Sequence, residues 1–377
     1  MTGAAINKEL SFLRPNNFKQ PNYKLIQKFG EKLKNLILTT EIERYLEKRN
    51  GQVFVISDLP IEWLSINEVP LCFTHDVCRM PEANYGSLYS AYSNNRLDGY
   101  DIPNDILSKT LVILGASEKE GKDEGFKKAF PLIEDLSSKK SFQTRRCLSI
   151  DDVAQAVNEL KPELLIFDCH GGFDEKTSTS FLVINGERLT GDDIVKHNIT
   201  APLVFLSACN TSPNYGYLYT IGEDFLYAGA FSVTTTFTPI SIGTGFGNYT
   251  RLINELEHAI KFGTYKNWLE FVAYVTRTSI LYEAYVAILL KKNLDDLKQH
   301  QNDSILAEID RRVIMFKDVS YRRQIFQEFK QGIRIPGTKK PIKLEDLNGD
   351  FLSYSHLGRA DLILFKSWIE NQKSNGD

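Results

Sequence analysis

The sequence predicts an α/β protein in which a mostly parallel sheet is flanked by helices. Between about residues 108 and 280, short apolar runs alternate with segments of helical periodicity, as in βαβ units. Two of these runs, Leu164–Cys169 and Leu203–Ser207, are continuously apolar, which is typical of strands buried on both faces. The chain has 377 residues, enough for two or three folding units.

Each element of this block follows from a local pattern. Ser149 and Thr190 each stand three residues before an aspartate, which predicts the N-cap of a helix. The predicted strands are Leu111–Leu114, Ser141–Cys147, Leu164–Cys169, Leu203–Ser207 and Phe231–Thr236. The predicted helices are Gly125–Leu136, a helix from Ser149 to Leu160, a short one after Thr190, one from about Gly222 to Gly229, and one from about Gly247 to Lys261. We interpret the glycine-rich run Gly243–Gly247 as a turn that leads into the last helix.

The flanking regions are less regular. Residues 1–107 contain helical pieces near 24–49 and one strand-like run, Gly51–Ile56, so we assign them to an N-terminal accessory region that packs on the central block. Residues 281–377 are helical in pattern and highly charged, and we expect a helical C-terminal extension. The division is therefore 1–107, 108–280 and 281–377.

Composition excludes several classes of protein. With 45 Lys and Arg against 48 Asp and Glu, the net charge of −3 predicts neither a nucleic-acid partner nor an anionic membrane surface. The longest apolar run, Ala284–Leu290, is far shorter than the ~20 residues of a membrane span, and we expect no secretory leader. Five cysteines are too few for a disulfide scaffold, which favours a reduced, cytoplasmic protein.

Two predicted strands end in residues that can do chemistry. Asp168-Cys169-His170-Gly171-Gly172 ends the first, and Ser207-Ala208-Cys209-Asn210-Thr211 ends the second. If these strands are neighbours in a parallel sheet, His170 and Cys209 emerge at the same edge. A thiol has a pKa of about 8.5, so an imidazole that takes its proton would produce the nucleophilic thiolate. The backbone N–H groups of Gly171 and Cys209 are candidates for an oxyanion hole.

The His-Gly strand end, the Ser-Ala-Cys-Asn-Thr strand end and the segment Gly222–Val233 (GEDFLYAGAFSV) occur in an order that resembles the CHAT peptidases, caspase-like and separase-related cysteine proteases. The resemblance covers about residues 108–280. It implies a caspase–hemoglobinase fold and a Cys209/His170 dyad that needs no metal or organic cofactor. It further implies a protein substrate, an activating partner or ligand, and a role in bacterial, including antiviral, defence or regulated cell death. Separase-like relatives carry a degenerate caspase-like half beside the active one, and residues 1–107 are a candidate for such a half.

Several other residues are candidates for substrate binding. Where separases place an acid for a basic P1 side chain, this chain reads Thr236–Ile242 without a carboxylate, so we expect an uncharged P1 residue. Asp168 is an orienter or a substrate contact, Asn210 shapes the nucleophile loop or touches substrate, and Glu223 and Asp224 serve the helix start or a pocket. The remaining candidates, for the wall of the P1 pocket, are Thr235, Thr236 and Phe237.

One alternative function stays open at this stage, and a metal site is also considered. A catalytically silent caspase-like fold that serves as a binding or scaffold module would keep the same architecture without proteolysis. Cys72, His75 and Cys78 are close in sequence, but a structural zinc site takes four ligands and no fourth follows, so no metal is expected.

Overall fold

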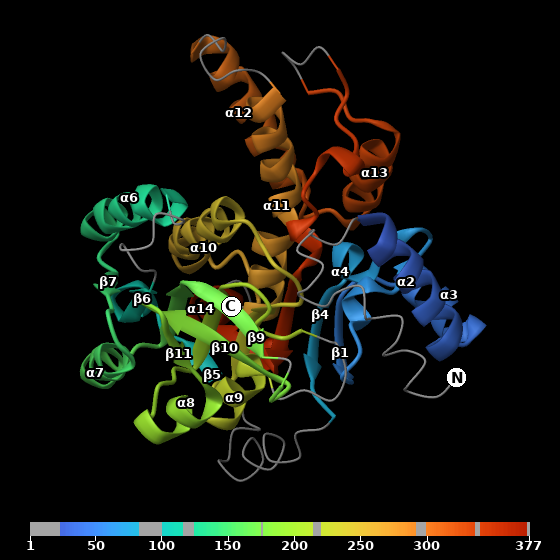
Figure 1. Cartoon of the computed structure of the whole chain (residues 1–377). Coiled ribbons are helices and arrows are strands. Elements are labelled where there is room, and N and C mark those ends of the chain that lie inside the picture. The colour runs from blue at the N-terminus through green and yellow to red at the C-terminus, as the bar shows by residue number, and fades with distance from the viewer. Residues whose placement is uncertain are drawn as a thin grey trace.

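The structure is a computed structural model that describes residues 23–82, 100–115, 124–174, 176–213, 220–291, 299–335 and 340–374. Its centre is a sheet of eight strands (Figure 1), which confirms the predicted class. From one edge to the other the strands are β1 (Gln52–Ile56), β4 (Asp76–Met80), β14 (Tyr354–Gly358), β13 (Ser232–Thr236), β12 (Leu203–Ser207), β8 (Leu164–Asp168), β6 (Thr110–Leu114) and β7 (Gln143–Arg146). Neighbours pair in parallel except β13 and β14, so the sheet is mostly parallel.

Helices cover both faces of this sheet (Figure 1). One face carries α6 (Glu124–Lys140), α10 (Ile242–Phe262) and α11 (Trp268–Lys291), and the other carries α7 (Ile150–Leu160), α8 (Gly191–His197) and α9 (Ile221–Tyr227). Side chains of a strand alternate between faces, so β6 sends Val112 and Leu114 into one apolar core and Leu111 and Ile113 into the other. The continuous apolar runs of the sequence are thus explained by burial on both faces.

Side-chain caps fix where the helices begin. Ser149 accepts a hydrogen bond from the backbone of Asp152 at the start of α7, and Thr190 forms a capping box with Asp193 at the start of α8. Ser241 caps α10, which therefore begins at Ile242. The interpretation of Gly243–Gly247 as a turn is wrong, because these glycines form the first turns of α10.

The flanking regions join the same sheet. In the N-terminal region, α2 (Tyr23–Ile37), α3 (Thr40–Lys48), α4 (Leu71–Thr74) and the short strands β2 (Ser65–Ile66) and β3 (Val69–Pro70) surround β1 and β4. The C-terminal region contains α12 (Gln299–Met315), α13 (Val319–Gln331) and α14 (Lys366–Ser374). It is not helical throughout, since β14 lies between β4 and β13 in the middle of the sheet. One sheet thus runs through all three predicted parts.

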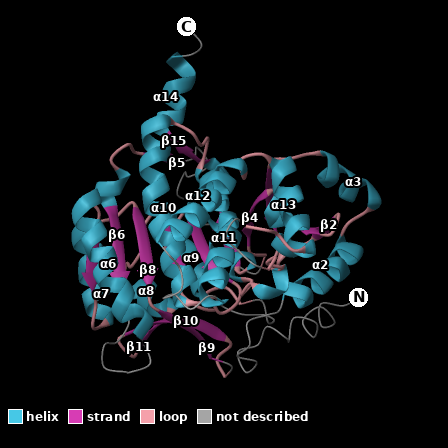
Figure 2. Cartoon of the chain, turned by 90° about the horizontal axis from the view of Figure 1, so that it is seen from above, coloured by secondary structure: helices cyan, strands magenta, loops and turns pink. Residues whose placement is uncertain are grey.

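A second, small sheet extends beyond the carboxyl ends of β8 and β12. It consists of β9 (His170–Asp174), β10 (Thr179–Ile184) and β11 (Glu187–Leu189), all antiparallel. Figure 2 shows it at one end of the molecule, while β5 (Tyr100–Ile102), β15 (Ile363–Phe365) and α14 lie at the opposite end. The sequence analysis did not predict these strands. In the described segments, no helix has the length and apolar character needed to cross a membrane.

Candidate active site

The two candidate strand ends lie side by side. β8 and β12 pair in parallel, with Asp168 opposite Ser207. His170 and Cys209 each come two residues after this pair, so they lie at the same edge of the sheet. The His170 ring packs edge-on against Phe126 of α6, with ring centroids 5.0 Å apart. The Cys209 thiol donates to the carbonyl oxygen of Ile240, just before α10. Both side chains therefore lie on the face that α6 and α10 cover.

The backbones of the two strand ends are in direct contact. A Cβ atom built on Gly171 would fall 2.0 Å from the carbonyl oxygen of Cys209 and 2.9 Å from its backbone nitrogen. No side chain fits between them, so glycine is required at position 171 for this approach. The structure thus places the residue after His170 against the backbone of the predicted nucleophile.

A tight turn presents Cys209. Asn210 has φ = +52°, a left-handed conformation that asparagine tolerates better than most residues. Thr211 then anchors the turn to the end of β13, because its hydroxyl accepts from the backbone of Thr236 at 2.7 Å. Asn210 and Thr211 are both buried, as expected of residues that shape the nucleophile loop. The Cys209 thiol itself is partly buried, and its burial raises the thiol pKa.

Asp168 lies under the site, where a substrate has no access. Only 1% of its surface is exposed, and its carboxylate accepts from the hydroxyls of Tyr249 at 2.7 Å and Ser207 at 3.5 Å. Burial raises the pKa of this carboxyl to about 7. These bonds join the ends of β8 and β12 to α10, so Asp168 positions the two strands. Ser207 was identifiable from its place two residues before Cys209, whereas no sequence signal indicated Tyr249.

The two carboxylates at the start of α9 have different surroundings. Asp224 packs against α8, where a Cβ on Gly191 would lie 2.2 Å from its Oδ2. Glu223 is partly buried, and the positive charge of Arg79 acts to lower the pKa of its carboxyl. Burial raises the pKa of both carboxyls to about 7. Asp224 thus lies in the contact between α8 and α9, whereas Glu223 lies within reach of the charge of Arg79.

The residues expected to line the P1 pocket lie in the core in this structure. Thr235, Thr236 and Phe237 have no exposed surface. Thr235 donates to Ser355 of the neighbouring strand, and Thr236 donates to the Ala208 carbonyl at 2.6 Å. Thr236 therefore supports the nucleophile loop from below, and none of the three residues forms an open pocket wall.

A buried charge cluster that the sequence analysis missed lies beside these threonines. Arg79 forms an ion pair with Glu62 at 3.3 Å, and both side chains are 1% exposed. The Arg79 guanidinium also lies over the ring of Phe237, 5.2 Å from its centroid, and donates to Ser212 in the nucleophile loop at 3.5 Å. No local pattern indicates this cluster, because its members are up to 175 residues apart in sequence.

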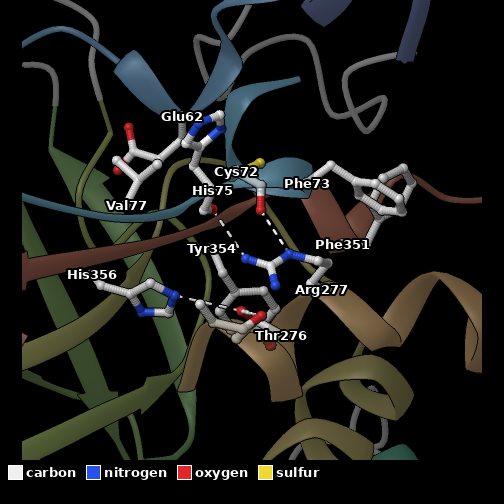
Figure 3. Close-up of a pocket in the computed structure, with 11 residues that line it drawn as sticks. Glu62, Cys72, Phe73, His75, Val77, Thr276, Arg277, Phe351, Tyr354 and His356 are labelled. Carbon is white, nitrogen blue, oxygen red and sulfur yellow. Dashed lines mark hydrogen bonds between the residues drawn. The ribbon is translucent and has the colours of Figure 1, made fainter. Parts of the chain in front are cut away.

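A small cavity next to this cluster is lined by further polar side chains (Figure 3). Arg277 of α11 donates to the carbonyl oxygens of Cys72 and His75, and His356 bonds Thr276. The ring nitrogens of His75 are hydrogen-bonded to the Thr74 hydroxyl and the Arg49 carbonyl, so both are used in bonds within the protein. Among the described residues, no three His, Cys, Asp or Glu side chains are arranged to hold a metal ion.

Comparisons with known proteins agree on the fold. Residues 107–259 match the family model of the CHAT domain. A crystal structure of the Arg-specific cysteine proteinase gingipain R (RgpB) matches with a TM-score of 0.51 and 9% identity, over 91% of this chain and 68% of that one. The complex of Porphyromonas gingivalis RgpB pro- and mature domains matches with a TM-score of 0.47 and 9% identity, over 89% and 72% of the chains. No curated protein matches the sequence. At 9% identity the likeness to gingipain R is one of fold.

Proposed function

We propose that this chain, whose residues 107–259 form a CHAT domain on a caspase-like fold, is a cysteine endopeptidase with Cys209 as nucleophile and His170 as base. The observation that carries the proposal is the contact between the two strand ends. Gly171 meets the backbone of Cys209 so closely that only glycine fits, and both reactive side chains lie on one face of the sheet.

The chemistry follows from these positions. His170 takes the proton of the Cys209 thiol, and the thiolate attacks the carbonyl carbon of the scissile peptide bond. Negative charge develops on the carbonyl oxygen, which the backbone N–H groups of Gly171 and Cys209 stabilise. The imidazolium then protonates the leaving amine. Water, with His170 again acting as base, hydrolyses the acyl-enzyme and restores the thiol.

The Cys209 thiol donates to the Ile240 carbonyl, and burial raises its pKa, so both effects lower the fraction of nucleophilic thiolate against the activating effect expected of His170. This supports an enzyme that a partner or ligand switches on. The resemblance to CHAT peptidases favours a bacterial defence or cell-death pathway in the cytoplasm.

We expect an uncharged P1 residue. Of the three carboxylates that we considered as partners of a basic P1 residue, Asp168 is bonded within the core and Asp224 packs against α8, so we take Glu223 as the candidate partner for a cationic side chain. Its own pKa, raised to about 7 by burial, makes it a poor fixed anion. A positional-scanning peptide library would decide this. Strong selection of Arg or Lys at P1, lost in Glu223→Gln, would contradict the expectation.

The same chain carrying Cys209→Ala tests the proposed function. Wild-type protein should cut a cognate protein at one discrete position, and Cys209→Ala should not. Cys72→Ala is the matched control, because Cys72 is also partly buried but lies in α4. If Cys209→Ala cleaves as wild type does, the chain is not a Cys209 peptidase, and a silent caspase-fold scaffold becomes the better account.

A further inference from the structure

A groove of about 320 Å³ lies between α10 and α11, beside the N-terminus of α10. This volume is within the range of small-ligand sites, and as in such sites polar side chains are combined with glycine, apolar and aromatic residues. The glycine, apolar and aromatic residues are Gly243, Gly247, Tyr282, Tyr285, Val286 and Ala287.

The floor of the groove is bare helix backbone. Glycine inside a helix costs about 1 kcal/mol relative to alanine, so each of the three glycines in this segment needs a reason. Gly245 has one, because a Cβ there would lie 2.5 Å from the Ser207 hydroxyl. At Gly243 and Gly247 a Cβ would meet no atom within 4 Å, and neither has a positive φ. Glycine at these two positions leaves room for an occupant close to the backbone.

The groove has hydrogen-bond donors that a ligand could use. Arg251 stacks on the ring of Tyr282, 4.2 Å from its centroid, and its guanidinium donates to Asn248 Oδ1, to the Val275 carbonyl and to the Thr278 hydroxyl, which leaves further N–H groups for a ligand. No carboxylate within the described segments lies at ion-pair distance from it. Asn248 is 1% exposed, and its Nδ2 has no hydrogen-bond partner among the described residues. The Tyr354 hydroxyl interacts with this amide but, like it, lacks a well-formed hydrogen bond in the part of the chain described.

The acceptors of the groove, in contrast, are already used. Both carboxylate oxygens of Glu283 accept backbone N–H groups, from Gly349 at 2.9 Å and Phe351 at 2.7 Å. Asp346 accepts from the backbone of Lys343 at 2.8 Å. The amide lacks a well-formed hydrogen bond, and Arg251 has only the more distant charge of Glu255 near it, so both would be satisfied by an acceptor that is negatively charged.

We propose that this groove binds a small ligand with a carboxylate on a flat apolar body, and that the ligand controls the reactivity of Cys209. The carboxylate faces Arg251 and Asn248, and the apolar body lies over the glycine floor. Ser241, on the rim, donates its backbone N–H to Asp350 at 3.0 Å, and the preceding carbonyl, of Ile240, holds the Cys209 thiol. The second part of this proposal, control of Cys209 by the ligand, rests on the proposed function, because it names the class of ligand that would activate the proposed peptidase.

Binding is tested with the full chain carrying Cys209→Ala, so that proteolysis plays no part. Saturation-transfer NMR with benzoate as probe should give an affinity that Arg251→Gln and Gly247→Leu each weaken by about tenfold. Benzyl alcohol should lose affinity with Gly247→Leu only, and His258→Leu, an exposed position further along α10, should change neither probe. Gly243→Leu replaces Gly247→Leu if circular dichroism shows that the latter is unfolded. No benzoate binding up to about 10 mM, or equal binding by all variants, would overturn the site.

Control of Cys209 is tested in the otherwise wild-type chain. Saturating benzoate should change the rate at which iodoacetamide alkylates Cys209 by about threefold or more, and Arg251→Gln should remove this response. An unchanged rate of Cys209 alkylation with benzoate bound would overturn the proposed control of Cys209 by the ligand. Cleavage by Cys209→Ala would instead refute the proposed function and leave the binding result standing.

Discussion

Replacing Asp168 by asparagine should change how the stability of the protein depends on pH. The carboxyl is buried between Tyr249 and Ser207, and burial raises its pKa to about 7. The unfolded chain, in which an aspartate has a pKa of about 3.9, releases this proton at much lower pH. The native state therefore binds more protons between about pH 4 and 7. The stability that this group provides is full below pH 4, falls across that window and is lost above it.

The size of the effect follows from the difference in pKa. About 3 units correspond to about 4 kcal/mol over the whole window, of which about 2–3 kcal/mol falls between pH 5 and pH 8. Asparagine has the same shape and still accepts from Tyr249, but it does not titrate. The free energy of unfolding of Asp168→Asn, relative to wild type, should therefore rise by about 2–3 kcal/mol from pH 5 to pH 8.

Urea denaturation followed by circular dichroism at pH 5, 6, 7 and 8 measures this difference. Asp135→Asn is the matched control, since Asp135 is exposed on α6 and bonds only Lys139 among the described residues. Its pH profile should run parallel to that of wild type. If the Asp168→Asn profile is also parallel to wild type within about 1 kcal/mol, the carboxyl does not carry the raised pKa that its burial implies.

Three further experiments test the packing around the site and the cap of α8. Gly171→Ala should abolish cleavage and lower the melting temperature, because its Cβ would lie 2.0 Å from the Cys209 carbonyl; an active, stable variant would refute the contact. Gly245→Ala should lower the free energy of unfolding by about 1–3 kcal/mol, because its Cβ would lie 2.5 Å from the Ser207 hydroxyl. Adding Ser207→Ala removes that hydroxyl, so the double variant should recover much of the loss, and no recovery would contradict the contact. Thr190→Ala should cost about 1 kcal/mol through loss of the α8 cap, measured by urea denaturation, and an unchanged midpoint would show that the cap contributes nothing.

The central strands and their helices were predictable because their signals are local. β12 was predicted with its observed bounds, and α7 begins directly after the predicted cap at Ser149. β14 could not be found in this way, since Tyr-Ser-His-Leu-Gly has no apolar run and is held by polar contacts with β13, such as Thr234 to His356. Its position depends on partners more than 100 residues distant.

For the candidate site, the sequence indicated which strand ends meet but not what supports them. His170 and Cys209 could be placed at the same edge of the sheet because each follows an apolar strand. The roles of Tyr249, Arg79 and Ser212 depend on helices and strands that tertiary packing brings together. The start of α10 was misplaced because glycines weaken the helical pattern, although Ser241 supplies the cap.

The most direct test of the account is the rate at which iodoacetamide alkylates each cysteine at pH 7.5, followed by peptide mass spectrometry in wild type and His170→Ala. If His170 activates Cys209, this thiol should react at least about tenfold faster than Cys72, the other partly buried cysteine, and His170→Ala should remove that advantage. An equal Cys209 rate in wild type and His170→Ala, with the fold intact by circular dichroism, would contradict the dyad.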